Sequence, residues 1–252
     1  MGFLMLFNDR SLFASCFAKI VPAFAPVLLG ITLMLNAFQA IAQPIVEIET
    51  NLGMIEITLH PESAPGHVEN FLNYVNDGDY TNSFFHRSVP GFIIQVGGFA
   101  YSNQQLSNVP ADPPVTNEYN LSNLRGTVAM AKLGNDPDSA TNQWFINLAD
   151  NDANLDNQNG GFTVFGTVTS GMVIADTIAD LDIINAGSQF NNLPIRNVSS
   201  LSNPVVWDDH LVLINQATEL VNVPTLPSLF SVLLVALVTC IATRKKPAVN
   251  ES

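Results

Sequence analysis

Residues 84–98 read Phe84-Phe85-His86-Arg87-Ser88-Val89-Pro90-Gly91-Phe92-Ile93-Ile94-Gln95-Val96-Gly97-Gly98. This run places one arginine and one glutamine among apolar residues, and its second half is typical of a strand that follows a Pro-Gly turn. Successive side chains of a strand point to opposite faces of the sheet. The alternation therefore predicts one face with Phe92, Ile94 and Val96 and another with Ile93 and Gln95.

A second block lies further along the chain, in two parts. The first part reads Arg125-Gly126-Thr127-Val128-Ala129-Met130-Ala131-Lys132, and the second reads Ser139-Ala140-Thr141-Asn142-Gln143-Trp144-Phe145-Ile146-Asn147. In this order and at this spacing, the two blocks resemble the bacterial branch of the cyclophilin family, the peptidyl-prolyl cis-trans isomerases. The resemblance extends over roughly Pro44 to Leu220.

Short apolar runs separated by turn signals recur through the middle of the chain. They lie at Val128–Ala131, Trp144–Leu148, Phe162–Val168 and His210–Ile214. Many short strands with two helices predict a mainly β fold, namely a closed antiparallel barrel capped by those helices. The resemblance adds that a cyclophilin-like barrel has eight strands and a helix at each end.

Periodicity predicts the first elements of this domain. Val46 and Ile48, and later Ile55, Ile57 and Leu59, alternate with polar residues, which indicates a hairpin whose turn is Asn51-Leu52-Gly53. A helix is predicted from about Pro65 to Gly78, because apolar residues recur at i, i+3, i+4 and i+7. Its apolar stripe consists of Val68, Phe71, Leu72 and Val75.

The later part of the domain is predicted to hold one more helix and two loops. Ile174, Ile178 and Leu181 mark a helix that begins near Ser170. The segment Ser102–Pro114 is rich in Asn, Gln and Pro, and Asn185–Asn203 is similarly polar. Both are predicted to be loops, the second as an insertion before the closing strand.

The resemblance implies a catalytic role for Arg87, assisted by Gln95. A guanidinium is a fixed cation with a rigid fork of donors, which suits it to a twisting amide bond. The amide of Gln95 both donates and accepts, so it could hold the arginine or a substrate carbonyl. Taken alone, Arg87 would suit an ion pair on an acidic surface and Gln95 would suit an ordinary polar position.

The resemblance also implies a binding site for the proline ring and the adjoining backbone. Phe92, Ile93, Phe145 and Leu155 correspond to the proline pocket, although apolar residues on strands are ordinarily core. Ala131 and Lys132 match the edge that pairs with the backbone of a bound peptide. Gln143 matches a glutamine of the family, and Phe162 stands where bacterial members carry an aromatic residue.

Three positions depart from the family pattern. Ile93 replaces a common methionine, and Val96 replaces a glycine and could crowd the adjoining backbone. Asn154 stands where animal members carry tryptophan, which removes an aromatic wall. This last change predicts weak binding of cyclosporin without loss of isomerase activity.

Charge and cysteine content narrow the possible partners. Of the 22 acidic residues, all but Asp9 and Glu251 fall between Gln43 and Val223, so this region has 20 acidic residues against four basic ones. Such a surface repels phosphate backbones, which argues against a nucleic-acid partner.

Cys16 and Cys240 lie in the apolar ends, so the domain can form neither a disulfide nor a thiolate metal site. The isomerase reaction needs no cofactor, and we expect a monomer.

Both ends of the chain have the composition of membrane-related segments. Residues 1–42 are predicted to be an export signal, with cleavage after Ala40-Ile41-Ala42; lipid attachment at Cys16 and an uncleaved anchor are the alternatives. Residues 221–252 combine a short Pro motif, an apolar run to Thr243 and the cluster Arg244-Lys245-Lys246. This order resembles PEP-CTERM sorting tails, and a plain single-span anchor fits it equally well. Either reading places residues 43–220 in the bacterial cell envelope, facing the periplasm or the exterior.

The predicted function is isomerisation of X-Pro bonds in unfolded or exported polypeptides. Two alternatives from other classes remain open at this point. The domain could bind proline segments without turning them, or the chain could be a surface or matrix component in which the tail matters more than the barrel.

Overall fold

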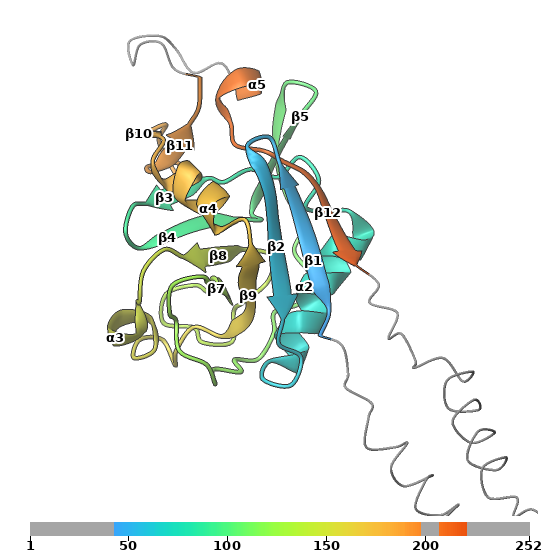
Figure 1. Ribbon diagram of the computed structural model, residues 1–252, viewed down its shortest axis with the longest axis vertical. Helices are drawn as coiled ribbons and strands as arrows, with labels where there is room; N and C mark the ends of the chain where they lie inside the picture. Colours follow the sequence, from blue (N-terminus) through green and yellow to red (C-terminus); the bar gives the residue numbers. More distant parts are fainter. Residues whose placement is uncertain (1–42, 198–206, 221–252) are drawn as a thin grey trace, which may run out of the picture. The chain divides into compact units, whose positions relative to one another are not determined.

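The computed structural model describes residues 43–197 and 207–220, which lie within the domain predicted at 43–220 (Figure 1). The expected export signal and sorting tail fall outside the described residues. Within this part of the chain, no helix is both long enough and apolar enough to cross a membrane. The elements in order are β1 Ile45–Thr50, β2 Gly53–Leu59, α2 Pro65–Asp77, β3 Arg87–Val89, β4 Ile93–Val96, β5 Phe99–Ser102, β6 Gln105–Asn108, β7 Thr127–Met130, β8 Trp144–Asn147, α3 Asp152–Leu155, β9 Val164–Ser170, α4 Met172–Ala179, β10 Asp182–Ile184, β11 Leu193–Ile195, α5 Trp207–His210 and β12 Ile214–Leu220.

Eight strands form one curled antiparallel sheet in the order β12-β1-β2-β9-β7-β8-β4-β3. This confirms a mainly β fold with eight antiparallel strands. The expectation of a closed barrel is corrected, because β12 and β3 are the edges of the sheet and the described residues contain no ladder between them. An isolated bridge between Phe84 and Leu213, just before these two edge strands, joins the neighbouring segments instead. The sheet therefore curls into a half-barrel.

The hairpin β1–β2 follows the predicted alternation. Val46 pairs with Ile57 and Ile48 with Ile55, and all four side chains are fully buried in the main core. The helix α2 begins at Pro65 as predicted, and Gly78 ends it in the left-handed conformation with φ 78°. Only glycine adopts that conformation at little cost, which is why the helix stops there.

The first turn of α2 is capped from a distant part of the chain. Ala64 precedes the helix and offers no side-chain acceptor. Instead, the carboxylate of Glu118 accepts the N–H groups of Gly66 at 3.1 Å and His67 at 3.0 Å, and it also bonds Nδ1 of the His67 ring at 2.8 Å. Burial raises the pKa of Glu118, but these hydrogen bonds outweigh it and the net pKa is lowered. The contact fixes the segment around Glu118 to the body of the domain.

The second predicted helix is α4, which begins after Gly171 and buries Ala175 and Ile178. The helix α2 packs against β12 and β9, and α4 packs against β2, β3 and β4. Two short helices, α3 and α5, were not predicted, because four residues are too few to show a helical period. The run His210–Ile214 was predicted as a strand; the structure instead ends α5 at His210 and begins β12 at Ile214.

The prediction that Ser102–Pro114 is a loop was partly wrong. Its beginning forms the turn and second strand of the hairpin β5–β6, in which Tyr101 pairs with Leu106. Asn103 and Gln104 make the two-residue turn with φ of 51° and 61°. Positive φ at both central positions is the requirement of the tightest hairpin turn. All four residues of β6 are exposed, so the strand has no apolar alternation that could reveal it in the sequence.

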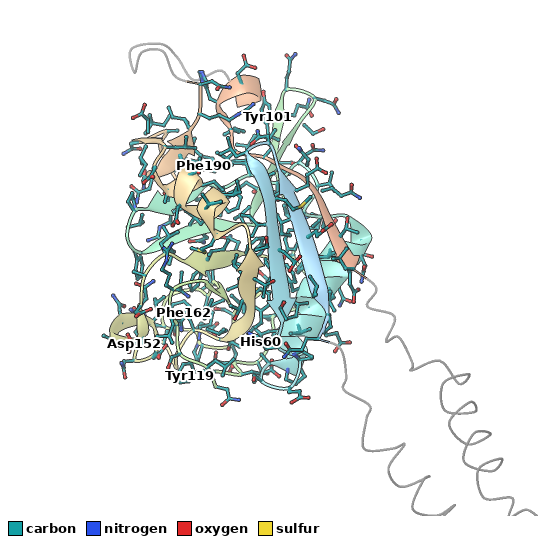
Figure 2. The ribbon with its side chains drawn as sticks, in the orientation of Figure 1. His60, Tyr101, Tyr119, Asp152, Phe162 and Phe190 are labelled. Atoms are coloured by element: carbon teal, nitrogen blue, oxygen red, sulfur yellow. The ribbon has the colours of Figure 1, made fainter. Side chains whose placement is uncertain are left out.

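The predicted loop Asn185–Asn203 also contains a strand, and its residues 198–203 lie outside the described part. β11 pairs with β10, and Phe190 packs between Phe84 and Phe99 with ring centroids 5.7 and 4.9 Å away. Leu193, Ile195 and Leu211 complete this satellite cluster. Figure 2 shows Phe190 on the side of the molecule that carries β10 and β11. The segment is therefore anchored by a small core of its own beside β3.

Candidate active site

Arg87 and Gln95 face each other across the first two strands of the site. Arg87 on β3 is the register partner of Gln95 on β4, and Nη1 of Arg87 donates to Oε1 of Gln95 at 3.2 Å. Nε2 of Gln95 donates in turn to Oε1 of Gln143 at 2.9 Å. Gln143 lies just before β8, the strand that pairs with the other side of β4. Strands β3 and β4 and the residue just before β8 thus present one hydrogen-bonded series of polar side chains.

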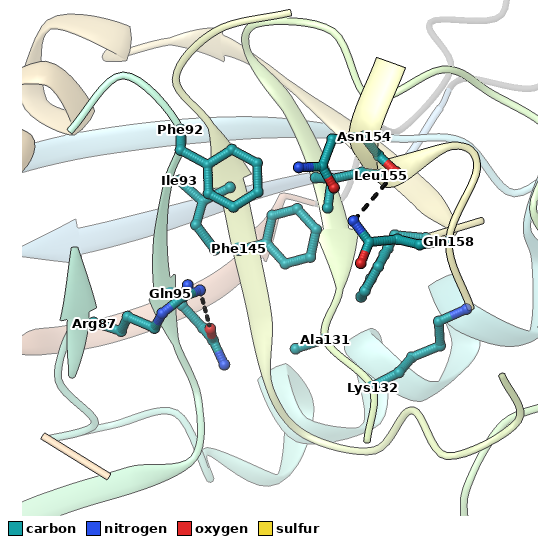
Figure 3. Close-up of a pocket in the computed structure, with 11 residues that line it drawn as sticks. Arg87, Phe92, Ile93, Gln95, Ala131, Lys132, Phe145, Asn154, Leu155 and Gln158 are labelled. Carbon is teal, nitrogen blue, oxygen red and sulfur yellow. Dashed lines mark hydrogen bonds between the residues drawn. The ribbon is translucent and has the colours of Figure 1, made fainter. Parts of the chain in front are cut away.

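A pocket of about 370 Å³ opens beside this series (Figure 3). Its polar side is formed by Arg87 and Gln95, and its apolar side by Ile93, Phe145 and Leu155. The complete lining consists of Arg87, Phe92, Ile93, Gln95, Ala131, Lys132, Phe145, Asn154, Leu155, Gln158 and Phe162. The arrangement offers a cation at the rim of a slot that can hold a small apolar ring.

The apolar side belongs to a cluster separate from the main core. Ile93, Ala129, Phe145, Leu155 and Val164 pack together, with Phe92 and Phe162 against them. Ile94 and Val96 point the other way into the main core, as the alternation predicted. Phe92 was predicted to share their face, but it packs with Ile93 because it precedes β4 and does not follow the strand alternation. Val96, which stands where the family pattern has glycine, is fully buried in the main core.

Buried amides hold Phe92 in place. Its carbonyl accepts from Nδ2 of Asn151 and from the backbone N–H of Leu148, both at 2.8 Å. Nδ2 of Asn151 also donates to Oδ1 of Asn147, a fully buried residue at the end of β8. A buried amide must satisfy its polar atoms, so these bonds leave the Phe92 backbone little freedom.

A second buried amide holds the opposite wall. Nδ2 of Asn123 donates to the carbonyl of Phe162 at 3.0 Å and to Oδ1 of Asp156 at 2.9 Å. The backbone N–H of Phe162 donates to the carbonyl of Leu155 at 3.0 Å. The Phe162 ring meets Phe145 edge to face, with centroids 5.8 Å apart. Both aromatic walls of the pocket are therefore fixed from behind.

Lys132 uses its ammonium group within the protein. Nζ donates to Oδ1 of Asn117 at 3.0 Å and to the carbonyls of Asn159 and Gly161 at 2.8 and 2.7 Å. It also lies 5.0 Å from the centroid of the Phe162 ring, a cation–π contact. The side chain thus ties the segment 159–162 to the pocket, and pairing with the backbone of a bound peptide remains a prediction for this position.

Arg87 is half-buried, and burial lowers the pKa of its guanidinium from the usual value. Among the residues that the structure describes, no carboxylate lies within ion-pair distance of it. The alternative role of Arg87 in a surface ion pair is therefore not what is observed. Groups of three or more His, Cys, Asp or Glu side chains suited to a metal ion are likewise absent from residues 43–197 and 207–220.

Comparison with known proteins shows which protein family the chain belongs to. Residues 45–200 match the family described as cyclophilin type peptidyl-prolyl cis-trans isomerase/CLD. The chain belongs to the cyclophilins. Peptidyl-prolyl cis-trans isomerase A of Dickeya dadantii is 39% identical over 193 residues, which cover 75% of this chain and 98% of that protein. The peptidyl-prolyl cis-trans isomerase of Acinetobacter baylyi is 41% identical over 172 residues, which cover 67% of this chain and 89% of that protein.

Solved structures of cyclophilins share the fold. A cyclophilin type peptidyl-prolyl cis-trans isomerase of Cryptosporidium parvum aligns with a TM-score of 0.53 at 22% identity, covering 71% of this chain and 99% of that chain. A structure determined in the presence of the dipeptide Ala-Pro aligns with a TM-score of 0.52. At this level of identity, the likeness concerns the fold alone.

The structure brings together the residues that the cyclophilin resemblance singled out. Nine of them line the pocket, and the tenth, Gln143, lies behind it and bonds to Gln95. Asn154, noted only as a departure, also lines the pocket, and Gln158 was missed. Figure 3 shows Gln158 donating to the backbone of Asn154, at 3.3 Å. The polar run around Asn154 offered no periodic signal that could have placed Gln158 there.

Proposed function

We propose that this cyclophilin isomerises X-Pro bonds of exported polypeptides in the cell envelope, with Arg87 as the electrostatic catalyst. The observation that carries the proposal is the guanidinium of Arg87, oriented by Gln95 at the rim of an apolar pocket. The envelope location and the exported clients are supported by the composition of residues 1–42 and 221–252.

The chemistry requires little beyond this geometry. Rotation about a peptide bond is opposed by about 18 to 20 kcal/mol, because the nitrogen lone pair is delocalised into the carbonyl. In the twisted state this delocalisation is lost and the prolyl nitrogen becomes a hydrogen-bond acceptor. A donor that meets the nitrogen only in that state lowers the barrier without stabilising either planar form. Arg87 supplies the donor, and Ile93, Phe145 and Leu155 supply a slot for the ring.

The size of the effect can be bounded. Removing one such donor from an enzyme typically costs about 3 to 4 kcal/mol, or about two to three decades of rate. We therefore expect Arg87→Ala to lower kcat/KM by about a hundredfold or more. Arg87→Lys should recover only part of the loss, because an ammonium does not reproduce the fork that bonds Gln95.

A protease-coupled assay on an Ala-Pro peptide tests the proposal, with the purified full chain in detergent. Arg125→Ala is the matched control, because it removes an exposed arginine that pairs with Asp176 and does not line the pocket. Activity that is lost in Arg87→Ala and kept in Arg125→Ala supports catalysis. A parent protein that binds the peptide but does not accelerate isomerisation would favour the alternative of a silent binding module.

A further inference from the structure

The polar series of the active site has a fixed direction. Arg87 has only donors, so it requires the oxygen of Gln95, and the amide nitrogen of Gln95 then requires the oxygen of Gln143. The position of the Gln143 amide therefore sets the orientation of Gln95, and through it the orientation of Arg87. The Gln143 side chain is in turn held by a hydrogen bond with the side chain of His86 and by its contact with the chain at Gly98.

Gln143 lies directly on Gly98, in the link between β4 and β5. A Cβ atom at Gly98 would come within 2.7 Å of Cδ, 2.8 Å of Nε2 and 3.0 Å of Cγ of Gln143. These three atoms belong to one side chain, and no backbone atom is among the nearest contacts. The empty space at Gly98 is thus filled by the amide of Gln143.

The neighbouring glycine shows what a purely structural requirement looks like. Gly97 has φ +91°, and a Cβ there would come within 2.4 Å of the backbone carbonyl of Asn142. Gly98 is outside the left-handed region, so its φ does not by itself require glycine. The tight contacts of a side chain at Gly98 would therefore be with the side chain of Gln143.

We propose that Gly98 is a positioning residue for the isomerase reaction. The missing side chain leaves the space in which Gln143 lies, and Gln143 in that place aligns Gln95 and Arg87. This inference rests on the proposed function of Arg87. It gives a mechanistic reason for the second glycine of the pair that closes the run 84–98.

Gly98→Ala is expected to impair the reaction without impairing the fold. The added methyl group forces the half-buried Gln143 side chain to rotate away, which breaks its bond to Gln95 but displaces no backbone. Alanine also restricts the unfolded chain more than glycine does, which favours the folded state. We expect kcat to fall about tenfold, with KM for an Ala-Pro peptide within twofold of the parent and the melting temperature not lowered.

The matched control is Gly134→Ala, which adds the same methyl group at a glycine with no atom within 4 Å and no positive φ. It should leave kcat and KM unchanged. In a Gln143→Ala background, Gly98→Ala should cause no further loss, because the side chain that it displaces is gone. The double variant also keeps the test decisive if Gly98→Ala alone folds poorly, since the clash is removed.

A second readout is independent of activity. In two-dimensional NMR, the side-chain amide signals of Gln95 and Gln143 should shift in Gly98→Ala and stay in place in Gly134→Ala. Unchanged amide signals, a kcat within twofold of the parent, or an additional loss in the Gln143→Ala background would each overturn the inference. An inactive parent would instead count against the proposed function, while the NMR comparison would still decide the role of Gly98.

Discussion

Acid should destabilise this domain through His86, the residue next to the proposed catalyst. His86 is 3% exposed, and its ring meets Phe99 edge to face with centroids 4.9 Å apart. Burial lowers the pKa of His86 from 6.5 to about 4, and the positive charge of Arg87 adds to this effect. The imidazole is therefore neutral in the folded protein at pH 7 and remains so well into the acid range.

The sign of the effect follows from proton binding. Between pH 6.5 and about 4 the unfolded chain binds a proton at His86 and the folded protein does not. The free energy of unfolding therefore rises with pH across this window and falls on acidification. At about 1.4 kcal/mol for each pH unit, the difference between 6.5 and about 4 amounts to about 3 kcal/mol.

Urea unfolding at pH 7 and pH 4, followed by tryptophan fluorescence, measures this contribution in the parent and in His86→Phe. Phenylalanine keeps the ring contact with Phe99 but cannot bind a proton. We expect the parent to lose about 3 kcal/mol more than His86→Phe on acidification. His60→Gln is the control, because His60 is only half-buried and should contribute much less. Equal acid losses in the parent and His86→Phe would refute the reasoning.

Two further predictions concern the pocket. Lys132→Met removes the ammonium that holds the segment 159–162, so Phe162 should lose order and KM for a proline peptide should rise about fivefold with kcat near the parent value. Steady-state kinetics measure this, and an unchanged KM would contradict the role of the lysine. Asn154→Trp adds an aromatic wall at a residue that lines the pocket, so it should tighten inhibition by cyclosporin at least tenfold. Inhibition of the variant that is no tighter than inhibition of the parent would contradict this second prediction, and submicromolar inhibition of the parent would contradict the expected weak binding.

The fold was predictable where apolar residues repeat. The hairpin of β1 and β2, the stripe of α2 and the start of α4 follow from periods of two and 3.6 residues, since each element buries one face. The elements missed were short or polar. β6 is exposed along its whole length, and β11 depends on Phe190, a single aromatic residue in a polar segment whose partners Phe84 and Phe99 lie far away in sequence.

Local sequence pattern could likewise not predict that the eight-stranded sheet curls without closing into a barrel. A sequence reports which residues can form strands, but whether two edges pair depends on the summed twist of all the strands between them. The edge strands β12 and β3 remain unpaired with each other in the described residues, and the bridge between Phe84 and Leu213 lies in the segments before them.

The sequence by itself determined the chemistry of this protein: an arginine, a glutamine and a set of apolar residues, in an order that marks a cyclophilin. Tertiary structure alone decided how these groups are held. The bonds from Lys132 to Asn159 and Gly161, and the contact between Gly98 and Gln143, join residues that are distant along the chain. Side-chain identity is encoded locally, but distances and hydrogen-bond partners exist only once distant strands have packed together.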